Sequence, residues 1–393
     1  MKYRILSFND YYIPSTKAGG PVRSMKNAVD ALHDEFDFYI ECYDYDFGCK
    51  GQRYSNIKDG WQEVGFAKVI YQPYGTLDFK YKNMEKFIRE VKPDVIWFQG
   101  LLMPHKVHNA IRVAEKMGIP TIISPRGEAS PDRMALKGYK KYPYAVLCNL
   151  LGIYHKENVF FHATSDDEVV GLKKFFKVRQ DRIYQIVNIP VAVAENPIFP
   201  SKQKGSIRIM FVSRIHEVKN ILLAVQIVKK LKCKAVFDIY GPIESKDYWN
   251  LCLKEMESLP ENIQINYCGL LPMDQVGKTF QNYDAFLFPT INENYGHVIA
   301  EALANGCPTV LSKGTTPWDD LDGVAGYIAD LKNENEFKMK LEKLALLDEE
   351  EYTALRKSTI EYFKRKQDEE GAIAGHAQMF IDVIKKMKEK RSV

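Results

Sequence analysis

The 393-residue chain is 46% hydrophobic and 27% charged, with a formal net charge of +4 at pH 7. This composition excludes a disordered or fibrous chain, and the length suits two domains better than one. The small net charge argues against a nucleic-acid partner, because nucleic-acid-binding domains usually carry a stronger basic charge.

The apolar residues and cysteines exclude two further classes of protein. No apolar run reaches the length of about 18 residues that a spanning helix needs, and the N-terminus runs into a strand pattern instead of a signal peptide. The seven cysteines are scattered and form no CxxC pair. That favours reduced thiols over a disulfide framework or a zinc site, so we expect a cytoplasmic protein.

The first half of the chain alternates short apolar runs with helical patterns. Such alternation is typical of a parallel sheet covered by helices on both faces. The expected strands are 3–8, 37–42, 67–71, 94–98, 121–124, 159–162 and 184–187, and the expected helices include 22–32, 83–91 and 105–117.

The alternation begins again after a connection at 190–204 that contains prolines and lysines. We expect strands at 208–212, 235–240, 263–267, 284–289 and from Pro308, and helices at 220–231, 247–257, 274–281 and 297–304. The fold class is therefore α/β, with two βαβ domains in series at 1–195 and 196–372.

The tail has a helical pattern from 361 to 388. Ile373, His376, Phe380, Val383 and Met387 recur on one face at steps of three and four. Such a stripe must pack against something. A helix at about 373–393 could close back onto the first domain, but the sequence alone does not identify the surface that it covers.

A pair of glycines, Gly19 and Gly20, follows the first expected strand and opens a helix that contains Arg23. Paired glycines let backbone N–H groups approach a phosphate, and a helix N-terminus favours negative charge. Pro21 suits the first helical position. A tight turn before a helix is the alternative, since the six-residue dinucleotide fingerprint is absent.

Two cations, Arg214 and Lys219, lie in the loop after the first strand of the second half. Arginine offers a planar fork and lysine a point charge, so together they could clamp two phosphates. The alternative is a solvated basic loop in which Asn220 caps the next helix.

Two glutamates, Glu293 and Glu301, stand eight positions apart in the stretch 284–318. The order strand, turn, helix places Glu293 at the carboxyl end of a strand, where open α/β sheets bind ligands. Glu301 follows about two turns into the helix. The pair could act as acid and base, as in glycoside hydrolysis, accept hydrogen bonds from sugar hydroxyls, or be surface charges.

No metal site is expected. Asp44-Tyr45-Asp46 mimics the metal-holding DxD of another class of nucleotide-sugar enzymes, but no further carboxylates lie nearby in the sequence. The histidines lack metal-ligand spacing. His105 remains a candidate for the pocket because it follows the strand 94–98.

Two further segments of the first half carry candidate residues. Arg126 and Glu128 follow the strand 121–124, where they could contact donor sugar or acceptor, or pair with each other. Residues 136–156 mix lysines, tyrosines and leucines. That mixture suits either an interfacial helix on an anionic membrane or a buried amphipathic helix.

Taken together, the motifs resemble the retaining glycosyltransferases of family 4 over nearly the whole chain. The most specific part is ENYGHVIAEALANGCP, which holds both glutamates and is followed by Thr315-Thr316-Pro317-Trp318. The segments SPRGEASP and His162-Ala-Thr-Ser165 resemble bacterial members that build surface polysaccharides. The resemblance implies the GT-B fold, two Rossmann-like domains facing across a cleft.

The resemblance also implies roles. Arg214 and Lys219 would bind the donor diphosphate and stabilise the leaving group, Glu301 would accept from the ribose, and Glu293 would contact the transferred sugar. The implied donor-binding set is Gly19, Gly20, Arg214, Lys219, Glu293, Asn294, Tyr295, Gly296, His297, Val298 and Glu301. The implied catalytic set is Glu293, Arg214, Lys219 and Arg126, and the acceptor or pocket set is Arg23, Arg126, Glu128 and His105.

Two positions depart from the family pattern. Asn220 follows the lysine where many members have glycine. The pocket histidine of many members has no clear match, and we expect Arg126 to take part of its place.

The resemblance predicts a metal-independent hexosyltransferase that uses a UDP-sugar and no cofactor. Its acceptor would be a saccharide or a lipid-linked saccharide, with peripheral contact at the inner face of the cytoplasmic membrane through 136–156. An epimerase with the GT-B fold and a non-catalytic sugar-nucleotide-binding partner are the alternatives. The sequence indicates no oligomeric state.

Overall fold

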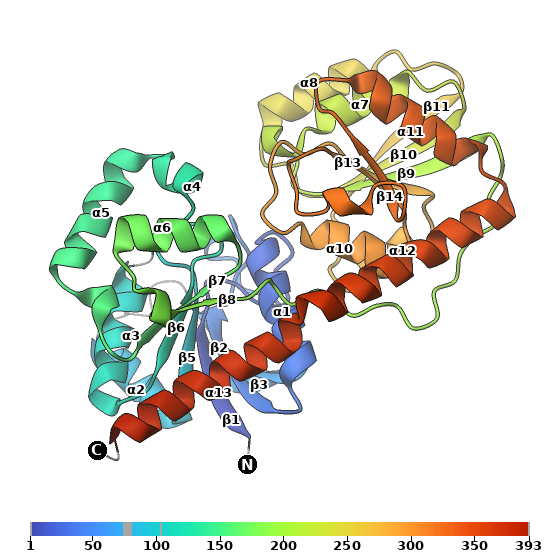
Figure 1. Cartoon of the computed structure of the whole chain (residues 1–393). Helices are drawn as coiled ribbons and strands as arrows, with labels where there is room; N and C mark the ends of the chain where they lie inside the picture. Colours follow the sequence, from blue (N-terminus) through green and yellow to red (C-terminus); the bar gives the residue numbers. More distant parts are fainter. Residues whose placement is uncertain (1, 74–80, 103, 392–393) are drawn as a thin grey trace. The chain divides into compact units, whose positions relative to one another are not determined.

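The structure is a computed structural model that describes residues 2–73, 81–102 and 104–391. It divides into two compact units, which we describe separately (Figure 1). The first unit comprises Met1–Ile189 and Gly371–Val393, and the second comprises Pro190–Glu370. We placed the boundary after residue 195. The structure assigns residues 190–195 to the second unit, where the Ala194 N–H donates to the Ala304 carbonyl at 3.0 Å.

The first unit contains a sheet whose described strands run in the order β3-β4-β2-β1-β5-β6-β7-β8. All neighbours are parallel except β3 and β4. We did not predict β3, a short edge strand without the alternation of a half-buried strand. The strands are β1 (Tyr3–Phe8), β2 (Phe36–Tyr43), β3 (Trp61–Val64), β4 (Ala67–Gln72), β5 (Val95–Gln99), β6 (Thr121–Ser124), β7 (Val159–Ala163) and β8 (Ile183–Gln185).

Helices cover both faces of this sheet. Along β1, Ile5 joins the buried cluster under α1 and α13, whereas Leu6 joins the cluster under α2, α3, α5 and α6. Successive strand residues point to opposite faces, so both faces are buried, as the continuous apolar runs predicted. The helices are α1 (Gly20–Leu32), α2 (Tyr81–Val91), α3 (Pro104–Met117), α4 (Pro131–Ala135), α5 (Gly138–Leu150), α6 (Asp166–Phe176) and α13 (Ala372–Arg391).

The second unit has a parallel sheet with the described order β11-β10-β9-β12-β13-β14. We did not predict β14 or α11. The strands are β9 (Ser206–Val212), β10 (Lys234–Tyr240), β11 (Ile263–Gly269), β12 (Ala285–Phe288), β13 (Thr309–Ser312) and β14 (Gly326–Ala329). The helices are α7 (Ile221–Lys229), α8 (Lys246–Met256), α9 (Val276–Phe280), α10 (His297–Ala304), α11 (Glu334–Leu346) and α12 (Glu349–Glu370). The α/β fold class predicted from the sequence is confirmed.

The expected tail helix is two helices, α12 and α13, which separate at Gly371. Gly371 has a φ of 55°, a left-handed conformation that glycine adopts without strain. In α13, the side chains of His376, Phe380 and Val383 are buried against the first unit, as the stripe predicted. Ile373, the first residue of that stripe, is exposed.

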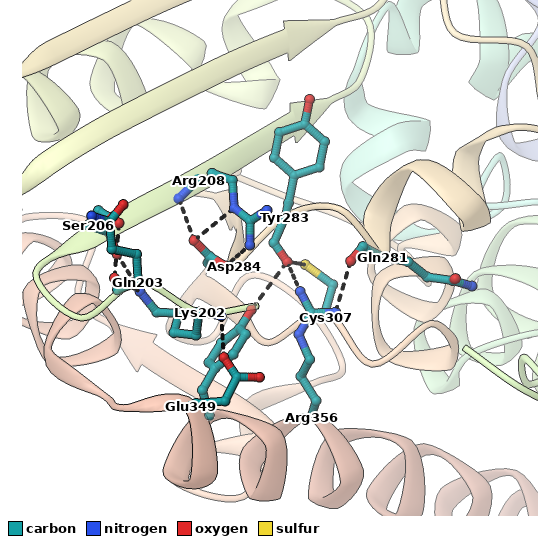
Figure 2. Close-up of polar contacts among 11 residues, drawn as sticks. Lys202, Gln203, Ser206, Arg208, Gln281, Tyr283, Asp284, Cys307, Glu349 and Arg356 are labelled. Carbon is teal, nitrogen blue, oxygen red and sulfur yellow. Dashed lines mark hydrogen bonds and ion pairs between the residues drawn. The ribbon is translucent and has the colours of Figure 1, made fainter. Parts of the chain in front are cut away.

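A polar network ties α12 to the amino end of β12 in the second unit. Figure 2 shows the Asp284 carboxylate facing the Arg208 guanidinium, with Nη2 and Oδ1 2.8 Å apart. Arg356, which is fully buried, donates from Nη2 to the Tyr283 carbonyl and from Nη1 to the Gln281 carbonyl at 3.1 Å. These contacts fix the strand end opposite to the edge where β12 leads into the Glu293 loop.

In the ranges 2–73, 81–102 and 104–391, no helix is both long enough and apolar enough to cross a membrane.

Candidate functional site

Two loops of the second unit meet at the carboxyl edge of its sheet. The loop after β9 carries Lys219, and the loop after β12 carries Glu293. β9 and β12 are neighbouring parallel strands, so both loops leave the same edge. Lys219 Nζ donates to Glu293 Oε2, and the side chains are only 12% and 22% exposed. Glu293 is therefore not an isolated surface charge.

Hydrogen bonds join these loops into one structure. The Ile291 N–H and the Thr290 hydroxyl both donate to the Val218 carbonyl, at 2.9 and 3.1 Å. The Glu293 N–H donates to the Thr315 carbonyl, at 2.9 Å, in the loop after β13. These bonds hold the backbone around the Lys219–Glu293 pair.

Arg214 lies in the same β9 loop and pairs with Glu244, which follows β10. Arg214 Nη1 donates to both carboxylate oxygens of Glu244, at 2.8 and 3.0 Å. A parallel bridge between Ile215 and Ile243 aligns the two loops. Our sequence reasoning missed Glu244, because no motif surrounds it and its partner lies 30 positions away.

The start of α10 presents the backbone predicted to contact the sugar. Gly296 has a φ of 77°, and a Cβ there would lie 2.8 Å from Ile299 Cδ1, so the turn requires glycine. The Trp318 indole N–H donates to the Tyr295 carbonyl at 2.6 Å. This hydrogen bond from Trp318 fixes the backbone of the turn. The predicted residues Asn294, Tyr295, Gly296, His297 and Val298 form this turn and the first helical residues.

Glu301 lies in the middle of α10 and is only 8% exposed. Its backbone carbonyl accepts from Asn305 Nδ2 at 2.9 Å. The near-complete burial excludes the simple surface charge that we considered as an alternative.

In the first unit, Gly19 is the N-cap of α1 and Gly20 is the first residue of that helix, so the pair opens a helix as predicted. Gly19 has a φ of 69° and open space around the position of a Cβ, so glycine is required here by conformation and not by crowding. The Arg23 N–H donates to the Gly19 carbonyl at 3.4 Å, and Pro21 occupies the first turn.

The Arg126 side chain is directed at groups of its own unit. Nε donates to Gln99 Oε1 at 2.7 Å, Nη1 donates to Asn188 Oδ1, and the guanidinium lies 5.7 Å from the centre of the Trp97 ring. Desolvation lowers the pKa of the guanidinium to about 10, although nearby Glu168 opposes the shift. These contacts favour a structural role, and a catalytic role stays a prediction.

Two further pocket candidates, Glu128 and His105, belong to the same unit. Glu128 does not pair with Arg126 in the described contacts. Its Oε2 accepts from the N–H groups of Leu101 and Leu102, at 2.6 and 2.9 Å, and so fixes the loop after β5. His105 lies in the first turn of α3, and its side chain is outside the described part of the chain.

A buried lysine at the carboxyl edge of the first sheet was also missed. Lys106 Nζ donates to Asp10 Oδ1 and lies 4.8 Å from the centre of the Tyr43 ring. Burial also raises the pKa of Glu41 to about 8, although the charge of Lys106 opposes the shift. In the sequence, the one indication that Lys106 lies at this edge of the sheet was its position next to the candidate His105.

The two aspartates of the DxD-like segment have separate protein partners. Asp46 accepts from residues that precede α1, and Asp44 Oδ2 lies 3.9 Å from Arg53 Nε. Within the described ranges, no three His, Cys, Asp or Glu residues are grouped so that they could hold a metal ion.

Comparison with protein families gives a match for the second unit. Residues 194–364 match the family described as "Glycosyl transferases group 1". This segment contains the Lys219–Glu293 pair, Arg214 and Glu301.

One curated relative is the GtfA subunit of the UDP-N-acetylglucosamine–peptide N-acetylglucosaminyltransferase of Streptococcus parasanguinis. It is 26% identical over 158 residues, which cover 39% of this chain. The match spans only 30% of the length of that relative.

Solved structures resemble the whole chain. HepE of Anabaena, solved with UDP and glucose, matches with a TM-score of 0.64 at 13% identity and covers 99% of both chains. Sucrose-phosphate synthase from Thermosynechococcus elongatus matches with a TM-score of 0.67 at 13% identity, covering 97% of this chain and 99% of that one. The fold is therefore GT-B, and the family match supports a glycosyltransferase.

Proposed function

We propose that the protein is a retaining glycosyltransferase that moves a sugar from a nucleotide diphosphate sugar to a saccharide acceptor. The observation that carries the proposal is the Lys219–Glu293 pair, which lies at the carboxyl edge of the sheet within the segment matched by the glycosyltransferase family model. In this proposal, Lys219 is the cation that binds phosphate and Glu293 is the carboxylate that binds sugar hydroxyls.

The leaving group determines what the site must stabilise. Breaking the anomeric C–O bond leaves a nucleoside diphosphate with added negative charge. Fixed cations and backbone dipoles aimed at that charge lower the barrier. We assign this role to Arg214 and Lys219, with N–H groups of Gly19 and Gly20 as further donors.

The two glutamates then act as acceptors for hydroxyl groups. Glu301 accepts from the ribose, and Glu293 accepts from the transferred sugar. Because Lys219 is paired with Glu293 in this structure, the diphosphate competes for the lysine and makes the Glu293 carboxylate available to the sugar. We favour attack on the face from which the diphosphate departs, with the diphosphate taking the acceptor proton.

The donor is a UDP-sugar in this proposal. A similar structure supports it, since HepE of Anabaena was solved with UDP and glucose. The cations at the site make a metal unnecessary. A lipid-linked saccharide is the proposed acceptor class, within the synthesis of a surface polysaccharide or another glycoconjugate.

We further propose that the first unit binds the anionic inner face of the cytoplasmic membrane. The support comes from α5 and its ends, where Tyr139 is 74% and Leu150 is 79% exposed. Large apolar side chains at water-exposed positions mark interaction surfaces. The surface consists of Leu136, Tyr139, Tyr142, Val146, Leu147, Leu150 and Leu151, with Lys137, Lys140 and Lys141 in the same segment.

A two-step experiment tests the proposed function. A thermal-shift screen against nucleotide sugars identifies the donor, because a ligand that binds the folded state raises its stability. Proton NMR then monitors the reaction of that donor with saccharide and lipid-linked acceptors. We expect a new glycosidic linkage that has the same anomeric configuration as the sugar in the donor. Inverted configuration would contradict retention. Free sugar or an epimer without acceptor would favour the epimerase, and binding without turnover would favour a non-catalytic partner.

A further inference from the structure

We propose that Asp46 is a positioning residue for glycosyl transfer, which holds the loop before α1 in the conformation that offers Gly19 and Gly20 to the donor diphosphate. The inference rests on the proposed function, because it needs that loop to bind phosphate. We call residues 15–20 the glycine loop and residues 44–49 the clasp segment.

The Asp46 carboxylate accepts hydrogen bonds from three consecutive residues of the glycine loop. Oδ1 accepts from the Ser15 hydroxyl at 2.5 Å and from the Lys17 N–H at 3.3 Å. Oδ2 accepts from the N–H and the hydroxyl of Thr16, at 2.9 and 3.1 Å. The Phe47 N–H also donates to Oδ1, at 2.7 Å. One side chain therefore fixes the backbone that leads into Gly19.

A second contact joins the same two segments. Lys17 Nζ donates to Cys49 Sγ at 3.1 Å, and the Cys49 N–H donates to the Asp46 carbonyl at 2.9 Å. The clasp segment is itself anchored to the sheet, because the Asp44 N–H donates to the Gln72 carbonyl at 3.0 Å. The glycine loop is thus held by two side chains of the clasp segment, the Asp46 carboxylate and the Cys49 thiol.

The charge of Asp46 suits this role. Burial opposes its ionisation, but the hydrogen bonds from Ser15, Thr16, Phe47 and Lys17 outweigh burial and hold the pKa of the carboxyl below its usual value. Hydrogen bonds to a carboxylate are stronger than those between neutral groups. The oxygens that a metal ion would need are directed at protein donors, which favours positioning over the metal role suggested by the DxD-like pattern.

Preorganisation is what the clasp contributes to the reaction. Backbone N–H groups stabilise developing charge only when they already point at it. The left-handed backbone of Gly19 is one of several conformations open to glycine, so an unheld loop would sample others. Fixing residues 15–17 next to it restricts that freedom.

The test compares Asp46→Asn with Asp44→Asn, a matched change two positions away whose carboxylate faces Arg53 instead of the glycine loop. Asparagine replaces one acceptor oxygen with an NH₂ donor, which then faces loop N–H or hydroxyl donors. With the donor found in the thermal-shift screen, we expect kcat to fall by about tenfold or more in Asp46→Asn, since a lost charge-stabilising donor commonly costs 10²–10³. Asp44→Asn should stay within twofold of the parent, and neither variant should depend on added Mn²⁺.

Thiol labelling provides a readout that does not need the enzymatic activity. In Asp46→Asn, we expect a disulfide reagent to label Cys49 several-fold faster, measured by peptide mass spectrometry with Cys268 as the internal reference. Unchanged labelling would overturn the clasp even if the proposed function stands. If the wild type neither binds nor turns over a nucleotide sugar, the proposed function fails while faster labelling still supports the clasp.

Two further outcomes decide the positioning role. Faster labelling with unchanged kcat would overturn it. Rescue of Asp46→Asn by Mn²⁺ would replace it with a metal site. If Asp46→Asn does not fold, Thr16→Val removes one bond from the same carboxylate at an exposed residue, and a smaller change in the same direction is expected.

Discussion

Lys219 and Glu293 neutralise each other across two loops, although 74 positions separate them in the sequence. The lysine is the proposed ligand of the donor diphosphate, and the glutamate is the proposed ligand of the sugar. The two proposed ligands of the donor are therefore each other's partners in this structure.

This pairing predicts opposite effects on nucleotide binding and on transfer. In Glu293→Gln, Lys219 loses its anionic partner, so we expect UDP without sugar to bind more tightly, by about three- to tenfold (0.6–1.4 kcal/mol). Transfer should fall, because the sugar loses a carboxylate acceptor. Calorimetry and a transfer assay measure the two quantities. Glu301→Gln offers a contrast, since losing a ribose acceptor should weaken UDP binding. Equal or weaker UDP binding by Glu293→Gln would mean that the pair does not compete with the diphosphate.

A buried histidine pair predicts how stability depends on pH. His162 and His376 lie with ring centres 4.5 Å apart where α13 packs on the first unit. His162 Nδ1 lies 2.8 Å from the Ser124 hydroxyl and Nε2 lies 2.8 Å from the Ile186 carbonyl, an arrangement that satisfies a neutral ring. Burial lowers the pKa of His376 to about 4 and that of His162 well below 6.5. His376 lowers the pKa of His162 further, and nearby Arg126 lowers both.

Because both pKa values are lower in the folded state, the unfolded chain binds more protons below pH 6.5. Stability is therefore retained above that pH and falls as the pH drops toward 4, by up to about 1.4 kcal/mol per pH unit for each histidine. Chemical denaturation between pH 7 and 5 measures the slope. His376→Phe should reduce it, whereas His155→Gln, at an exposed position, should not. If the dependence of stability on pH is unchanged in His376→Phe, protonation of His376 does not contribute to it.

The exposed apolar surface of α5 predicts binding to anionic lipid. Wild-type protein should co-sediment with vesicles that contain phosphatidylglycerol and bind more weakly to neutral phosphatidylcholine. Replacing Leu147, Leu150 and Leu151 with serine should abolish sedimentation. The matched control replaces Leu251 and Leu253, exposed leucines of α8, with serine. Equal loss in both variants, or equal binding to both lipids, would contradict a specific membrane surface on α5.

The assignment of diphosphate charge to Arg214 and Lys219 predicts metal-independent transfer. Activity should survive EDTA within about twofold, because the two cations assigned to the diphosphate would stabilise the developing charge without a metal. A strict requirement for Mn²⁺ or Mg²⁺ would contradict this assignment and would make Asp44 and Asp46 candidate metal ligands.

The sequence predicted the order of strands and helices well where burial was continuous. β1 and β6 were predicted with the bounds that the structure shows, because strands covered on both faces appear as unbroken apolar runs. β3 was missed because a short edge strand lacks that pattern. The stripe of α13 was recognised, but the break at Gly371 was not, since the helical pattern continues through it.

The site was harder to predict from sequence than the fold. Lys219 and Glu293 were singled out one by one, but their pairing depends on how three loops bond to each other. Glu244 and Lys106 carried no motif, and their partners lie 30 and 96 positions away. Asp46 was noted only for its likeness to a metal-holding DxD, because that pattern does not reveal which donors face the carboxylate.

The most direct test of the central claim is calorimetric titration of the donor UDP-sugar into wild-type protein and Lys219→Met, with Lys229→Met as the control. Lys229 lies on α7 and pairs with Glu255 at 3.0 Å, away from the Glu293 loop. The account predicts saturable binding to wild type and control, and binding weaker by about tenfold or more (1.4 kcal/mol) in Lys219→Met. Equal affinity in Lys219→Met and the wild type would contradict a donor site at the carboxyl edge of β9 and β12.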